Sequence, residues 1–261
     1  MGTFLGHLYP GFIFFCISIL TINNSCVKFI QSPDSYINLV YQNTNEILFK
    51  LFFTLIGFSC EIYNGYSNSS YLAPINAQHA MMYFSFFLSS AFELFCYITR
   101  DFTCSTHIAY RLWTYVYFLS SFSFEASLFL FHLHSRSKLN VYIHELLILT
   151  LMLILLFGSL ELHFPIELGY FISRSFFILL QGVWFIQIAF ILYSPVDIFN
   201  GFKHENMENI AYVSQIFVYT CCVSILILFS IILFTCRKRR PAYSQSTIDK
   251  DEITIYIRNI A

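Results

Sequence analysis

Five of the eight histidines fall near the same ends of successive apolar stretches of the chain. Neutral imidazole is the commonest metal ligand in proteins, and it suits zinc, copper, iron and nickel. If the apolar stretches fold as antiparallel helices, side chains at one level can converge in the middle of a bundle. The histidines predicted to share this level are His7, His79, His132, His134 and His144.

Glu125 adds a carboxylate to this histidine level. Seven residues separate Glu125 from His132, which puts both on one helix face but about 10 Å apart along the axis. One ion is therefore not expected to bind both, and Glu125 is expected to support the ligands or to bind a second ion. His132 and His134 point about 160° apart on a helix, so both can chelate one ion only if the helix ends at His132. The candidate metal set, with zinc or copper as the metal, is His7, His79, Glu125, His132, His134 and His144.

Two other interpretations of the histidines stay open. Histidines at a membrane interface commonly hydrogen-bond helix ends or lipid headgroups, and a cluster of them can also relay protons or sense pH. No two members of the set have the i, i+4 spacing of a helical metal-binding motif.

A second group of charged residues is expected at the opposite level. An arginine buried with carboxylates in a membrane most simply forms a structural ion pair that ties helices together. The predicted members of this pair are Arg174, Glu93 and Glu161. Gln181 and Gln187 are expected to hydrogen-bond neighbouring helices.

Composition identifies the elements that must position these residues. Of the 261 residues, 57% are apolar and only 11% are charged, against about 25% charged in ordinary soluble domains. The mean hydropathy is +0.65. A net charge of −1 provides no basic surface for nucleic acid. The sequence predicts an all-α membrane protein with seven transmembrane helices, embedded in the lipid bilayer, at about 8–30, 46–62, 74–98, 107–131, 142–162, 168–193 and 210–236.

Basic residues predict how these helices are oriented. Arg237, Lys238, Arg239 and Arg240 follow the last span, and the positive-inside rule puts them in the cytosol. Seven spans then put the N-terminus in a lumen or outside the cell. Residues 1–236 are expected to form the transmembrane domain and 237–261 a basic, disordered cytosolic tail. Asn68, in the sequon Asn68-Ser69-Ser70, is a candidate for glycosylation in a lumenal loop.

Several segments of the chain resemble the transmembrane protein 45 family, which is also catalogued as a domain of unknown function. They are Gly6-His7-x-x-Pro10-Gly11, Gln78-His79, Glu125 with His132-x-His134, His144, Ser159-Leu160-Glu161, Arg174-Ser175 and Leu180-Gln181-Gly182-x-Trp184-Phe185-x-Gln187-Ile188. The resemblance implies a seven-helix protein of endomembranes without an established enzymatic activity, and it groups the six candidate ligands as one set. Members often carry a Trp-His pair in the last span, where this chain has Phe217-Val218.

The function predicted from these observations is that of a multi-pass protein with a lumenal His/Glu cluster that binds a transition metal. Its role would lie in trafficking or membrane homeostasis, in the Golgi, the endosome–lysosome system or the plasma membrane, as a monomer or a homo-oligomer. One alternative is a metal-dependent intramembrane hydrolase or redox enzyme with Glu125 as the general base. Another is a transporter or channel, although the last three spans lack a mid-span proline.

Overall fold

A computed structural model describes most of the chain. The described residues are 3–31, 44–67, 70–103, 107–133, 136–165, 167–194 and 207–239, without the side chains of 30, 31, 100–103, 107–111, 132, 207 and 239. Asn68, His134 and residues 240–261 of the predicted tail lie outside the described residues, as does the side chain of His132.

Within the described part of the chain, all regular secondary structure is helical. Each helix covers one predicted span, and most extend a few residues beyond it. The spans were predicted from the apolar stretches alone, whereas helical hydrogen bonding continues into the polar flanks. The helices are α1 (Phe4–Gln31), α3 (Thr44–Tyr66), α4 (Pro74–Thr103), α5 (His107–His132), α6 (Lys138–His163), α7 (Leu168–Tyr193) and α8 (Met207–Arg239).

Five of the described helices are long and apolar enough to cross a membrane: α1, α4, α6, α7 and α8. Helices α3 and α5 have comparable lengths of 23 and 26 residues but are not among these five. Glu46, Lys50 and Glu61 lie on α3, and Glu125 lies on α5. These residues line the interior cavities described below.

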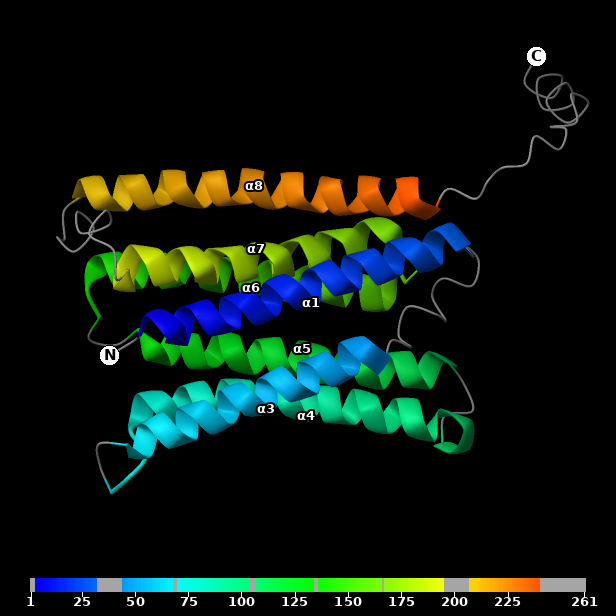
Figure 1. Cartoon of the computed structure of the whole chain (residues 1–261), viewed down its shortest axis with the longest axis horizontal. Coiled ribbons are helices and arrows are strands. Elements are labelled where there is room, and N and C mark those ends of the chain that lie inside the picture. The colour runs from blue at the N-terminus through cyan, green and yellow to red at the C-terminus, as the bar shows by residue number, and fades with distance from the viewer. Residues whose placement is uncertain are drawn as a thin grey trace, which may run out of the picture.

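The helices lie side by side along one long axis (Figure 1). Helix α7 is the most buried and packs against α1, α6 and α8. Helix α3 packs on α4 and α1, and α8 lies on the outer side of α1 and α7. Successive helices run in opposite directions (Figure 1). One end of the bundle therefore holds the N-terminal ends of α1, α4, α6 and α8 and the C-terminal ends of α3, α5 and α7.

Paired glycines allow α1 and α7 to approach closely. A Cβ atom built on Gly182 would lie 2.6 Å from the backbone N of Phe15, and one on Gly11 would lie 2.9 Å from the Gly182 carbonyl oxygen. Small residues at membrane helix contacts let backbones meet in this way. This contact joins two of the helices that contribute lining residues to both cavities described below.

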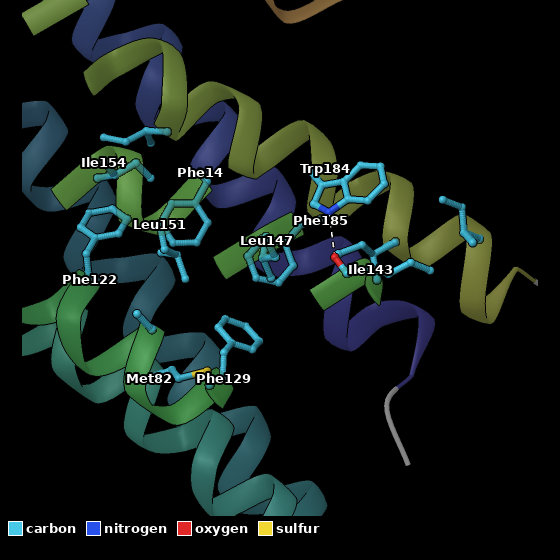
Figure 2. Close-up of a cluster of buried hydrophobic side chains, with 14 of the residues drawn as sticks. Phe14, Met82, Phe122, Phe129, Ile143, Leu147, Leu151, Ile154, Trp184 and Phe185 are labelled. Atoms are coloured by element: carbon cyan, nitrogen blue, oxygen red, sulfur yellow. Dashed lines mark hydrogen bonds between the residues drawn. The ribbon is translucent and has the colours of Figure 1, made fainter. Parts of the chain in front are cut away.

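Aromatic and aliphatic side chains fill the centre of the bundle (Figure 2). Trp184 on α7 is fully buried, and its indole Nε1 donates a hydrogen bond to the carbonyl oxygen of Ile143 at 3.2 Å. A buried indole N–H needs such a partner. The bond fixes α7 against α6 near the end of the bundle where the histidines gather.

Candidate functional site

Two buried histidines meet near the N-terminal ends of α1 and α6. His7 and His144 are only 4% and 2% exposed, and their ring centroids lie 5.7 Å apart in an edge-to-face arrangement. His7 Nδ1 lies 3.1 Å from the Thr3 carbonyl oxygen, and His144 Nδ1 lies 2.8 Å from that of Asn140. A ring nitrogen that donates to a carbonyl carries the proton, so in each neutral ring Nε2 carries the lone pair.

A third histidine, His79 at the start of α4, is held by a carboxylate. Its Nδ1 lies 3.4 Å from Glu61 Oε1, and the other Glu61 oxygen accepts a 2.7 Å hydrogen bond from the Asn76 side chain. Contact of Nδ1 with a carboxylate is the arrangement that orients metal-binding histidines elsewhere.

Glu125 approaches the same region from α5. It is 3% exposed, and the Gln181 amide donates to both of its oxygens at 3.1 Å. This bond joins α5 to α7 and confirms the interhelical role predicted for Gln181. A carboxylate held by a neutral amide keeps further acceptor positions for water or a cation.

His7, His79, Glu61 and Glu125 line one cavity of about 50 Å³, named here the histidine cavity. His144 lies beside it through the contact with the His7 ring. Pro10, inside α1, also lines it. Proline has no N–H to donate to the carbonyl four residues earlier, and here that carbonyl belongs to Gly6, another lining residue.

The other half of the bundle holds a larger cavity of about 110 Å³, named here the charged cavity. Its charged lining residues are Glu46, Lys50, Glu93 and Arg174. Lys50 Nζ donates to Glu93 Oε2 at 2.5 Å and lies 3.7 Å from Glu46 Oε1. Thr21 donates to Glu46 at 2.8 Å, so these contacts join α3 to both α4 and α1.

The predicted ion pair of Arg174 requires one correction. Arg174 Nε donates to Glu161 Oε2 at 2.6 Å and ties α7 to α6. Glu93 was predicted to share this pair, but its ion pair is with Lys50. The prediction used depth alone, whereas the rotation of α3 and α4 brings Lys50 and Glu93 face to face. The Arg174 guanidinium also lies 5.0 Å from the ring centre of Phe118 and 5.2 Å from that of Phe171.

The structure therefore brings His7, His79 and Glu125 to one cavity and His144 against His7. Among the described side chains, no three metal-ligating groups already stand close enough together to hold an ion. Val218, the position at which the resemblance implies a histidine, is 58% exposed. A histidine there would point away from the cavity, so its absence removes no ligand from this site.

Sequence reasoning missed Glu61, Glu46 and the internal role of Lys50. The depth comparison that grouped Glu125 with the histidines would also have found Glu61, because Glu61 lies at the end of the span that precedes His79. Lys50 lies near the start of its span, but its side chain is only 19% exposed and contacts both Glu46 and Glu93.

Part of the chain matches known sequences. Residues 113–235 match a family described as "Family of unknown function (DUF716)". The chain is 31% identical to transmembrane epididymal protein 1A of Mus musculus over 100 residues, which are 38% of this chain and 32% of that protein. It is 30% identical to transmembrane epididymal protein 1 of Rattus norvegicus over 100 residues, again 38% and 32% of the two chains. It is 28% identical to transmembrane epididymal protein 1 of Homo sapiens over 104 residues, which are 40% of this chain and 38% of that protein.

The chain thus spans roughly a third of the length of these curated relatives. The matched family segment begins in α5 and ends in α8. It includes Glu125, His144 and the Arg174–Glu161 pair, whereas His7, Glu61 and His79 precede it. The likeness supports an integral membrane protein of an uncharacterised family, and the chemistry of the cavities must be inferred from their geometry.

Proposed function

We propose that this chain is a seven-span membrane protein of the transmembrane protein 45 type, with a lumenal N-terminus and a cytosolic C-terminus. The partial match to a family of unknown function and the relatives named as transmembrane proteins support this assignment. A role in trafficking or membrane homeostasis, in the Golgi, the endosome–lysosome system or the plasma membrane, stays a prediction of the sequence.

The outer faces of α3 and α5 support counting them as spans. At 1.5 Å per residue their lengths of 23 and 26 residues give about 35 and 39 Å, against a hydrocarbon core of about 30 Å. Their described charged side chains, Glu46, Lys50, Glu61 and Glu125, line cavities, whereas apolar side chains face outward. Among these are Phe52 on α3 and Phe131 on α5.

We further propose that the histidine cavity binds one transition-metal ion, zinc or copper. The Nε2 atoms of His7 and His144 would supply the first two ligands, with Glu125 and His79 facing the ion across the cavity. The observation that carries this proposal is the buried contact of two rings from α1 and α6, each with Nδ1 turned to a backbone carbonyl. Zinc bound to imidazole needs nitrogen at about 2.0–2.1 Å, so both Nε2 atoms would have to move to that distance from the ion.

Metal analysis of the purified protein tests this proposal. Protein prepared without chelator should contain about one zinc or copper per chain, and the double variant His7→Ala/His144→Ala should contain none. His163→Ala is a matched control, because His163 makes the same Nδ1 contact with the carbonyl four residues earlier but is exposed. The proposal would be overturned if the native protein contained no metal after both purification and titration with Zn²⁺. It would also be overturned if His163→Ala lost as much metal as the double variant.

Topology is tested separately. The Asn68 sequon should carry a glycan that glycosidase removes, and Asn68→Gln should migrate as the deglycosylated protein does. A C-terminal tag should become accessible to antibody only after permeabilisation. Tag accessibility in intact cells would reverse the proposed orientation.

A further inference from the structure

One lining residue of the histidine cavity supplies a sulfur atom instead of an imidazole or a carboxylate. Met82 on α4 lines this cavity together with His7, His79, Glu61 and Glu125. It is only 8% exposed, so its thioether is enclosed by the bundle. Figure 2 draws Met82 together with Phe129, another residue that lines the cavity.

Helix geometry places His79 and Met82 on the same side of α4. They are three residues apart, which separates them by about 60° around the helix axis and about 4.5 Å along it. The same geometry turns Met81 about 100° away from Met82, and Met81 is 53% exposed. Helix α4 therefore presents an imidazole and a thioether to the cavity and its other methionine to the outside.

A thioether distinguishes between the two metals that the histidines could bind. Imidazole suits zinc and copper alike, whereas the soft, polarizable sulfur of methionine favours Cu(I). Zinc in proteins takes thiolate, imidazole and carboxylate ligands. The described residues that line the cavity include no cysteine, so Met82 is the soft ligand available there.

Aromatic rings form much of the remaining wall. The lining phenylalanines are Phe14, Phe86, Phe129 and Phe185. An apolar shell limits the access of water to a metal site, and the cost of moving an ion into such surroundings rises with the square of its charge. A monovalent ion therefore enters at a lower cost than a divalent one. Glu61 and Glu125 can balance either charge, so the sulfur decides between the metals.

We propose that the histidine cavity selects Cu(I) over Zn²⁺ and that Met82 is the residue that determines this choice. Met82 Sδ would join the imidazole ligands from α1, α4 and α6. This inference rests on the metal site proposed above and adds the identity and oxidation state of its ion. Copper is bound already reduced, so no electron transfer is part of the proposal.

Competition titrations of the purified protein in detergent test the choice of metal. Cu(I), kept reduced by ascorbate under argon, is titrated against a chromogenic Cu(I) chelator, and Zn²⁺ is titrated against a zinc chelator. The native protein should bind Cu(I) more tightly than Zn²⁺. Leucine conserves the volume of methionine, so Met82→Leu removes the sulfur and keeps the packing. Groups that only orient metal ligands are already worth about 10–100-fold in affinity, so Met82→Leu should weaken Cu(I) binding at least about tenfold. Its Zn²⁺ affinity should be unchanged.

Met81→Leu is the matched control, because it removes a sulfur atom from the neighbouring position on the outside of α4. Both of its metal affinities should equal those of the native protein. A second measurement needs no variant. When the methionines are replaced by selenomethionine, the X-ray absorption of bound Cu(I) should contain a copper–selenium contribution.

The outcomes separate this inference from the proposed metal site. Native Cu(I) affinity in Met82→Leu, equal weakening of Cu(I) and Zn²⁺ binding, or a missing copper–selenium contribution would overturn the role of Met82. If the native protein still binds either ion, the metal site then stands without selection by Met82. If the native protein binds neither ion, both proposals fail.

Discussion

The histidine cavity and the charged cavity lie along the same helices but satisfy their polar groups differently. In the charged cavity, full charges pair directly, as Lys50 does with Glu93 and Arg174 with Glu161. In the histidine cavity, Glu125 is held by a neutral amide and His7 by a backbone carbonyl, and only His79 faces a carboxylate, that of Glu61. A direct ion pair neutralises both of its charges. A neutral partner orients a carboxylate or an imidazole without neutralising it, so that group can still bind a ligand. The charged cavity therefore ties helices together, and the histidine cavity is the better candidate for binding.

Breaking the ion pair of Arg174 with Glu161 should produce the largest loss of stability. Arg174→Met leaves Glu161 buried without its counter-charge, which costs on the order of 3–5 kcal/mol. Thermal denaturation in detergent should show a strongly lowered Tm and reduced yield. The double variant Arg174→Met/Glu161→Met should recover most of the loss, because it removes both charges. Equal stability of the single variant and the native protein would show that the pair does not hold α6 to α7.

Gly182→Ala should cause the next largest loss of stability, because it disrupts the contact of α1 with α7, and both helices line both cavities. The added Cβ would meet the backbone of Phe15, which cannot yield as a flexible side chain can. Overpacking of this kind costs about 1–3 kcal/mol. Gly169→Ala is the matched control on the same helix, because a Cβ there meets nothing within 4 Å. A similar Tm for both alanine variants would contradict the proposed close contact.

Neutralising Glu125 in the histidine cavity and Glu161, the partner of Arg174, sharpens the comparison. Glu125→Gln should change stability by less than about 1 kcal/mol, since the new amide oxygen still accepts from Gln181. Glu161→Gln should cost several-fold more, because Arg174 loses its counter-charge. Both variants are isosteric, so thermal denaturation compares charge alone. The comparison fails if Glu125→Gln is the more destabilising of the two.

The smallest expected effect is at His163. His163→Ala changes an exposed side chain and should stay within about 0.5 kcal/mol of the native stability. His144→Ala removes a fully buried ring and should cost about 2 kcal/mol or more. The same denaturation assay measures both. Equal losses would mean that burial does not distinguish the two histidines.

The predicted spans and the helices agree because an apolar stretch such as that of α6 permits no other backbone at membrane depth. Span order also gave the depths of His7, His79 and Glu125, which line one cavity. It could not give the partner of Glu93, because depth leaves the rotation of each helix undetermined. Helices apolar on nearly every side carry little information about that rotation. Whether Glu93 pairs with Lys50 or with Arg174 depends on packing between segments that are far apart in the sequence.

The glycine contact between α1 and α7 has a consequence for biogenesis. Gly182 follows Gly11 by 171 residues, and at about 5–20 residues per second the ribosome needs roughly 10–35 s to make the chain between them. During that interval the first helix has entered the bilayer with His7 and Pro10 but without its principal neighbour. It must wait beside the insertion machinery or a chaperone until α7 arrives. Nascent chains truncated before residue 182 should therefore be recognised by membrane quality control and degraded, whereas chains that include α7 should be released as assembled bundles.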